Sequence, residues 1–378
     1  MRTRSEDFPR LVSVIEDERI RALFTERFLV ATEIFDEMVD AAAWRILDES
    51  GALPEPSGTL LSDTLERHPA RTRAALRFLH RKLLDSRLLD RDGDTYRTTE
   101  RRPGDVAALA AELRETVPEA AVGAEIVDLL VQEAPAFFRG EKSGEEILFS
   151  PIRLPLWFRY FSNDNLLYRI NNTLGAEILG RVAPERAEIL EVGGGCGSAA
   201  EAALRQLGAG VARYRFTELV PTFARRGERA ARAAASSDTA VEAGKLDMTK
   251  PWADQGIAPA SFDVVYSVNC FHVAPDLDAV LAEAKGALKP GGAVVVSECL
   301  RPTVLGRPIY VEFIFDFLES FTTVKTDPLK RPTHGFLTPE AWKASFAAAG
   351  FEDVTIWPDV DEIAKRFPDF FVGVVVAR

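Results

Sequence analysis

The chain has 378 residues, of which 47% are apolar, and it carries a formal net charge of −12. A chain of this length and apolar content is expected to form two domains with their own cores. Its acidic balance argues against nucleic-acid binding. No apolar run approaches the roughly 20 residues of a membrane span, and no apolar signal segment follows the charged first residues. We therefore expect a cytoplasmic protein without nucleic-acid or membrane partners.

Residues 1–150 are predicted to form a helical domain. Apolar positions recur at the three- and four-residue spacing of helices. The ranges concerned are 23–38, 41–47, 60–66 and 70–84. Two short strands with a turn at Asp92-Gly93 are expected next, and further helices follow. Helices followed by a small hairpin indicate a winged-helix-like module.

Two uses of this module remain open. Basic residues crowd its second helix, namely Arg71, Arg73, Arg77, Arg81 and Lys82. They could contact DNA, or they form the solvated face of a dimerisation domain that also covers the substrate. The acidic chain favours the second interpretation, so we expect a homodimer.

Aromatic residues and asparagines are interleaved over 157–172. Asparagine costs helix stability, so it often lies where its amide has a partner. This segment is interpreted either as a lid over a bound ligand or as ordinary packing between domains. Its candidate ligand contacts are Tyr160, Asn163, Tyr168 and Asn172.

From residue 187 onwards, strand and helix candidates alternate. The strands are expected near 188–192, 213–217, 240–243, 262–267, 292–298, 353–357 and 371–377. The helices are expected near 198–207, 221–236, 276–287, 310–322 and 338–349. This alternation predicts an α/β fold, in which a mostly parallel sheet carries helices on both faces. Ligands bind such sheets beyond the carboxyl ends of the strands.

A glycine-rich turn lies within the stretch from Ile189 to Ser198. Its glycines allow backbone angles that other residues avoid, and they let a ligand approach the bare peptide. The helix that follows directs free N–H groups at whatever occupies the turn. The residues singled out here are Glu191, Gly193, Gly195 and Gly197. They predict a nucleotide-type ligand.

Acidic residues after the next two strands extend this predicted site. Glu218 is suited to accept both hydroxyls of a ribose, and as an alternative it stabilises a helix N-terminus. Asp247 could accept the amine of a purine whose face Met248 covers. As an alternative, Asp247 only forms a turn.

Five ordered motifs carry a family resemblance. They are Glu191-x-Gly193-x-Gly195-x-Gly197, Glu218, Asp247, residues 262–267 and residues 288–292. The series resembles the class I S-adenosylmethionine-dependent methyltransferases and covers about residues 180–378. The resemblance implies a Rossmann-like sheet of seven strands with the last strand antiparallel. It also implies S-adenosylmethionine as cofactor, with its methionine part at the glycine turn, its ribose on Glu218 and its adenine on Asp247.

The same resemblance makes residues 151–378 the expected methyltransferase domain, with Ser267 and Asn269 as further cofactor contacts. His272, just after the fourth strand, is the predicted base, because an imidazole takes up a proton near neutral pH. Glu298 ends the neighbouring fifth strand and is expected to orient that imidazole. The alternatives are a packing histidine and a strand-end acid exposed to water.

The atom that receives the methyl group stays open. A His/Glu pair with an N-terminal winged helix resembles small-molecule O-methyltransferases, although their usual Trp after the His is absent at Val273. Residues 216–219 and 269–277 look more like the C-methyltransferase domains of polyketide synthases. We expect transfer to a hydroxyl oxygen of a small secondary-metabolite-type acceptor, and C-methylation of an acidic carbon, of polyketide or 2-oxo acid type, is the alternative. A cofactor-sensing DNA-binding regulator and a non-methylating enzyme are less expected.

Two further groups are candidates for the acceptor pocket. His334 lies in the loop before the last predicted helix and could line this pocket. It could also join His272 at a metal, but two histidines without a third ligand are poor evidence for a metal site, so no metal is expected. Glu312, Asp316 and Glu319 share one face of the helix predicted over 310–322. They either line the acceptor site or, more simply, form a solvated face.

Overall fold

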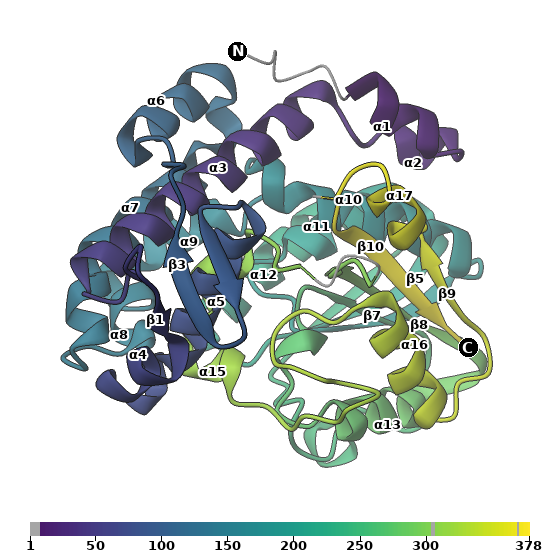
Figure 1. Ribbon diagram of the computed structural model, residues 1–378. Helices are drawn as coiled ribbons and strands as arrows, with labels where there is room; N and C mark the ends of the chain where they lie inside the picture. The colour runs from purple at the N-terminus through teal and green to yellow at the C-terminus, as the bar shows by residue number, and fades with distance from the viewer. Residues whose placement is uncertain (1–7, 304–306, 369) are drawn as a thin grey trace. The chain divides into compact units, whose positions relative to one another are not determined.

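A seven-stranded sheet organises the second half of the chain in this computed structural model, which describes residues 8–303, 307–368 and 370–378 (Figure 1). Its strands are β4 (Ala187–Val192), β5 (Val211–Thr217), β6 (Ala240–Gly244), β7 (Phe262–Val268), β8 (Leu288–Cys299), β9 (Val354–Trp357) and β10 (Val372–Ala377). They lie in the order β6-β5-β4-β7-β8-β10-β9. β10 is antiparallel to both of its neighbours, and the other pairs are parallel. This confirms the predicted Rossmann-like α/β fold.

The central strands of this sheet are apolar on both faces because helices cover both sides. Ile189, Val264 and Val295 have no exposed surface. The main covering helices are α10 (Leu166–Val182), α11 (Ser198–Leu207), α12 (Pro221–Ala234), α13 (Leu277–Ala287) and α16 (Pro339–Ala348), with the short α17 (Val360–Ala364) before β10. The register pairs Glu191 of β4 with Tyr266 of β7. The carboxyl ends of the central strands therefore meet at one edge of the sheet.

Two compact units divide the chain, and neither is continuous in sequence. One contains residues 25–160 together with 307–323, and the sheet unit contains 9–24, 161–303 and 324–378. The boundary expected at residue 150 therefore corresponds to no single cut. None of the described helices has the length and hydropathy needed to span a bilayer.

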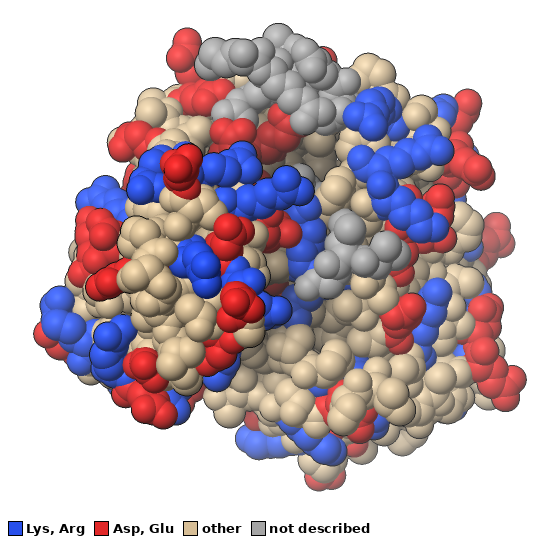
Figure 2. Space-filling model, in the orientation of Figure 1, with Lys and Arg blue, Asp and Glu red and all other residues tan. Residues whose placement is uncertain are grey.

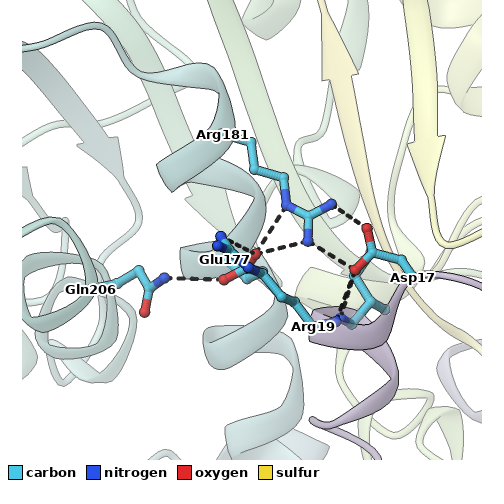
Figure 3. Close-up of polar contacts among 6 residues, drawn as sticks. Asp17, Arg19, Glu177, Arg181 and Gln206 are labelled. Atoms are coloured by element: carbon cyan, nitrogen blue, oxygen red, sulfur yellow. Dashed lines mark hydrogen bonds and ion pairs between the residues drawn. The ribbon is translucent and has the colours of Figure 1, made fainter.

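Within the sheet unit, a network of hydrogen bonds and ion pairs links residues 9–24 to helix α10 (Figure 3). Asp17 accepts hydrogen bonds from N–H groups at the start of α2 (Glu18–Arg21). It accepts two more from the guanidinium of Arg181 on α10, at 2.5 and 3.0 Å, and Arg181 also bonds Glu177 one turn earlier. The Arg181 hydrogen bonds hold the pKa of Asp17 well below its ordinary value. Because several charges share these contacts, the network holds more firmly than an isolated surface pair.

The other unit is mainly helical. Its helices are α3 (Glu26–Glu49), α4 (Leu61–Arg67), α5 (Arg73–Asp85), α6 (Val106–Thr116), α7 (Ala121–Phe138), α8 (Gly144–Leu148), α9 (Leu154–Tyr160), α14 (Glu312–Phe315) and α15 (Glu319–Thr322). A small antiparallel sheet has the order β1-β3-β2, from β1 (Thr59–Leu60), β2 (Leu89–Asp92) and β3 (Thr95–Thr98). The predicted hairpin is thus present, and the winged-helix assignment stays a prediction. The helices expected over 23–38 and 41–47 form the single helix α3, in which no glycine or proline interrupts the backbone.

Of the basic residues singled out on the second helix of this unit, Arg71, Arg73 and Arg77 are exposed, as expected, whereas Lys82 is buried. Lys82 is 1% exposed and lies 3.0 Å from Asp36 and 2.8 Å from Asp40 of α3. Arg71 and Arg73 donate hydrogen bonds to backbone carbonyls. On the face seen in Figure 2, basic side chains lie among acidic ones rather than in a patch of their own.

In the segment 307–323, the prediction that Glu312, Asp316 and Glu319 form a solvated face of one helix is wrong. The helix predicted over 310–322 is two short helices, α14 and α15. Glu312 and Asp316 are 0% and 1% exposed, and of the three acids only Glu319 is exposed. The reason is that this segment packs its aromatic rings against α5 and α7. Those ring pairs are Phe78–Phe313 and Phe137–Phe317.

The cluster around Lys82 predicts a pH-dependent stability for the helical unit. Burial raises the pKa of Asp40 to about 7, with Lys82 opposing the rise and Asp36 adding to it. An unfolded Asp loses its proton near pH ~4, so between about pH 4 and 7 only the folded state holds this proton. The free energy of unfolding therefore falls as pH rises through that window.

We expect Asp40→Asn to flatten this slope in urea unfolding measured between about pH 5 and 8. Asp48→Asn, at an exposed position on the same helix, serves as the control and should keep the wild-type slope. An unchanged slope in Asp40→Asn would show that Asp40 is not the titrating group.

Candidate active site

The glycine turn after β4 has the backbone geometry that only glycine adopts readily. Gly193, Gly195 and Gly197 have φ values of +70°, +53° and +85°, which lie in the left-handed region. A Cβ on Gly193 would lie 2.1 Å from the Sγ of Cys270, whereas a Cβ on Gly195 would meet nothing within 4 Å. Gly193 is therefore needed for packing, and Gly195 leaves open space beside its backbone.

Glu218 lies beside this open part of the turn. Its Oε2 accepts a hydrogen bond from the N–H of Gly195 at 2.9 Å, and its Oε1 accepts one from the N–H of Val220 at 2.7 Å. Glu218 as a whole residue is 8% exposed. The turn and the end of β5 thus hold an anionic group at the rim of the sheet, where the ribose contact was predicted.

Glu191 is a buried acid directly before the turn. It is 1% exposed, and its carboxylate oxygens have no hydrogen-bond partner at ordinary distance among the described residues. Burial raises the pKa of Glu191 to about 8, which the nearby Tyr214 hydroxyl partly offsets and the charge of Glu218 reinforces. The hydroxyls of Tyr214 and Tyr266 are likewise buried without such a partner. A buried, unsatisfied carboxyl group is costly and fits a site that receives a positively charged ligand group.

Asp247 has the turn-forming contacts that were the alternative to adenine binding. It accepts hydrogen bonds from the N–H and the hydroxyl of Thr249, at 3.1 and 2.6 Å, and pairs with Lys250 at 3.0 Å. The Thr249 and Lys250 contacts lower the pKa of Asp247 to about 2. Met248 is half-buried beside it. The adenine role of this pair stays a prediction.

Ser267 and Asn269 join the ends of the central strands. The hydroxyl of Ser267 donates to the carbonyl of Val192 at 3.1 Å. Asn269 has a φ of +47°, and its side-chain oxygen accepts from the N–H of Cys299 at 3.2 Å. Both residues shape the strand ends around the turn, and a direct contact with the cofactor stays a prediction.

His272 and Glu298 form the predicted pair. The Nδ1 of His272 lies 2.7 Å from Oε2 of Glu298, and the side chains are 5% and 0% exposed. Oε1 of Glu298 also accepts from the N–H groups of Cys270, at 3.2 Å, and His272, at 3.4 Å. With Nδ1–H donating to the carboxylate, the neutral ring has its lone pair on Nε2. The pair can therefore act as a general base with a fixed tautomer.

Two residues beside this pair have no signal in the sequence. The ring of Phe336 lies 4.2 Å from the ring of His272. Arg331 is buried and donates hydrogen bonds to the carbonyls of His272 and Ala274. Both lie in a loop without periodicity, so no spacing rule could have linked them to a histidine far back in the chain.

The remaining predicted residues fall in different places. Within the sheet unit, the amide of Asn163 donates to the carbonyl of Ser198 and to Glu201 of α11, and accepts from Asn172. Tyr168 contacts the ring of Phe161. These contacts brace α10 against α11 within the sheet unit, and the ligand-contact role of these residues stays a prediction. His334 is half-buried in the loop that follows Arg331. The others, Tyr160, Glu312 and Asp316, lie in the helical unit.

Comparisons with known proteins agree with this geometry. Residues 190–294 match the family model described as a methyltransferase domain. The chain is 26% identical over 249 residues to the polyketide synthase ThaG of Burkholderia thailandensis, and 27% identical over 248 residues to the lovastatin diketide synthase lovF of Aspergillus terreus. These matches cover 64% and 65% of this chain but only 4% and 10% of those synthases. The chain thus spans a small part of the relatives that it matches.

Solved structures with the same fold span the whole chain. The CurJ carbon methyltransferase has a TM-score of 0.74 at 19% identity and covers 98% of this chain and 96% of its own. The citrinin polyketide synthase CMeT domain has a TM-score of 0.74 at 16% identity, with 100% and 97% covered. The fold is that of the class I methyltransferases. Residues 190–294 therefore belong to a methyltransferase domain, for which S-adenosylmethionine is the cofactor.

The residues at the turn fit this cofactor. The open backbone at Gly195 gives room for a ligand, Glu218 offers carboxylate oxygens, and Glu191 offers a buried acid to a cationic group. Among the described residues, no group of three or more His, Cys, Asp and Glu side chains is placed to hold a metal ion.

Glu191 predicts that cofactor binding is linked to a proton. With a pKa of about 8, its carboxyl group is mostly protonated at neutral pH, and a cation bound at the adjoining turn favours the ionised form. We therefore expect S-adenosylmethionine binding to release a proton at about pH 7, and affinity to rise as pH increases towards 8. Calorimetry in two buffers with different ionisation enthalpies measures this release.

Glu191→Gln should bind more weakly and release no proton. Glu188→Gln, on the same strand, is the control, because its pKa is already lowered by Lys289. Wild-type binding with no proton release would contradict the assignment of Glu191.

Proposed function

We propose that the chain methylates an acidic carbon of a small polyketide-type acceptor. The buried His272–Glu298 pair is the observation that carries the proposal, because a carbon acceptor has to lose a proton before it can form a new bond. The polyketide synthases among the relatives support a carbon acceptor over the oxygen acceptor that was expected first. The segments 216–219 and 269–277 resemble the C-methyltransferase domains of polyketide synthases, and this likeness also favours a carbon acceptor.

The chemistry assigned to the pair is proton transfer. Bound S-adenosylmethionine supplies a methyl group on a sulfonium sulfur, which leaves as a neutral thioether. Nε2 of His272 takes the proton from an acceptor carbon that lies between two carbonyl groups, and the electron pair left on that carbon forms the bond to the methyl carbon. General-base assistance of this kind contributes about 10²- to 10⁴-fold in rate.

Glu298 supports the base in two ways. Its contact with Nδ1 fixes the ring orientation and the tautomer, so that Nε2 is the nitrogen that accepts the proton. Its negative charge then stabilises the imidazolium that forms. Because the carboxylate is fully buried and already accepts two backbone N–H groups, it is held in place before the acceptor binds. Because Glu298 is already in place, the imidazole of His272 does not have to reorient when the acceptor binds, and this lowers the barrier to proton transfer.

Several other expectations remain part of the proposal. The helical unit is proposed to contribute to a homodimer. Tyr160, Glu312 and Asp316 of that unit are each proposed as acceptor contacts, and so, separately, is His334 of the sheet unit. A cytoplasmic location is also a proposal.

The proposal is tested with acetoacetyl-N-acetylcysteamine thioester and S-adenosylmethionine that carries a trideuterated methyl group. We expect the label on the carbon between the two carbonyls, located by mass spectrometry and carbon NMR. Label on an enol oxygen would refute the carbon acceptor and support the oxygen alternative.

The catalytic pair is tested with His272→Ala and Glu298→Gln in the same assay. His272→Ala should lose about 10²- to 10⁴-fold in kcat, and Glu298→Gln about 10- to 100-fold. Both variants should bind S-adenosylhomocysteine like the wild type in calorimetry, which controls for misfolding. Undiminished turnover in His272→Ala would remove the proposed base.

A further inference from the structure

We propose that Arg331 is a positioning residue for the catalytic base, holding the backbone of His272 and balancing the charge of Glu298. This inference rests on the proposed role of the His272–Glu298 pair. Arg331 lies 59 residues beyond His272, in the loop between α15 and α16, and it is only 2% exposed. A buried arginine is rare unless it is paired, so its partners indicate its role.

The guanidinium of Arg331 donates hydrogen bonds to the backbone of the turn that carries His272. His272 lies in a single 3₁₀ turn, Phe271–Val273. Nη1 of Arg331 donates to the carbonyl of Ala274 at 2.5 Å, and Nη2 donates to the carbonyl of His272 itself. Carbonyls at the end of a short turn lack partners within it. The planar fork of arginine satisfies two of them at once and so fixes the backbone from which the imidazole projects.

Arg331 also supplies positive charge beside a buried negative charge. The hydrogen bonds that Glu298 accepts come from the imidazole Nδ1 and two backbone N–H groups, none of which is a permanent cation. Burial lowers the pKa of Arg331 to about 10, and the charges of Glu298 and Asp276 oppose that fall. At neutral pH the guanidinium is thus charged and within electrostatic reach of Glu298. Opposite charges attract each other more strongly in the protein interior than in water, because the effective dielectric constant is lower there.

The loop that carries Arg331 is itself anchored. The backbones of Asp327 and Arg331 exchange two hydrogen bonds of 2.9 Å, and the Asp327 side chain caps the turn between them. Lys330 pairs with Asp278 at 2.6 Å, and its carbonyl accepts from Ser345 of α16. Arg331 is therefore presented by a turn that is held by its own hydrogen bonds and by an ion pair.

The same loop reaches His272 from a second side. Phe336 places its ring 4.2 Å from the imidazole, tilted by 39°. One loop thus holds the base by its backbone, through Arg331, and by its ring, through Phe336. Neither contact involves the nitrogen that takes the proton. This arrangement suits a positioning role, because it limits the motion of the base through its backbone and its ring face.

The test compares Arg331→Lys and Arg331→Met with the wild-type chain. Arg331→Met should lower kcat for the acetoacetyl thioester by about 10- to 100-fold, as outer-shell partners of a functional histidine do, without changing affinity for S-adenosylhomocysteine. Arg331→Lys keeps the charge but not the fork and should lose less. Added guanidinium ion at low millimolar concentration should partly restore Arg331→Met, which a general loss of folding would not allow. Arg366→Met, at an exposed position in the same unit, is the matched control.

A second readout needs no acceptor. Nitrogen-15 NMR of histidine side chains can resolve the ring of His272, because the chain has four histidines and His272→Ala identifies the signal. We expect a single Nδ1–H tautomer in the wild type and an averaged tautomer signal in Arg331→Met. If the wild type fails to methylate the thioester, the proposed function fails and this measurement still tests Arg331. An unchanged His272 signal in Arg331→Met, or a kcat within twofold of wild type, would overturn the inference.

Discussion

The contact between His272 and Glu298 follows from the way in which two parallel strands end. The register of β7 and β8 pairs Val268 with Ser297, so Glu298 lies where the chain leaves β7 and turns towards His272. A fully buried carboxylate without partners would cost several kcal/mol. Here the backbone of the following turn and the imidazole Nδ1 supply its hydrogen bonds. The turn, the base and the strand end therefore form one structural element.

Cys270 joins this element to the cofactor turn. Its N–H donates to Glu298, and its sulfur fills the space beside Gly193, where any side chain would collide with it. On the other side, Glu218 bonds the backbone of Gly195. The glycine turn is thus held between the ends of β5 and β7. The glycine turn and the turn that carries the base are consequently held in a fixed relation to each other.

Local sequence patterns predicted much of the fold and of the candidate site. The features that they missed depend on packing between segments far apart in the chain. The antiparallel last strand is implied by the family resemblance, and the His272–Glu298 contact follows from the neighbouring ends of two parallel strands. The burial of Glu312 and Asp316 depends on a segment packing against helices some 200 residues earlier, which no helical face can indicate. Lys82 was placed on a solvated face for the same reason, since its partners lie on α3. Arg331 and Phe336 come from a loop, where periodicity carries no information.

The interleaved path of the chain limits how this enzyme can be dissected. A fragment starting at residue 151 would omit residues 9–24, and with them the anchor that Asp17 provides for Arg181. It would also retain residues 307–323 without the helices on which they pack, leaving Phe313 and Phe317 to meet water. Grafting the methyl-transfer activity into another protein therefore calls for the whole stretch from α1 (Phe8–Val14) to β10, with both junctions placed outside it.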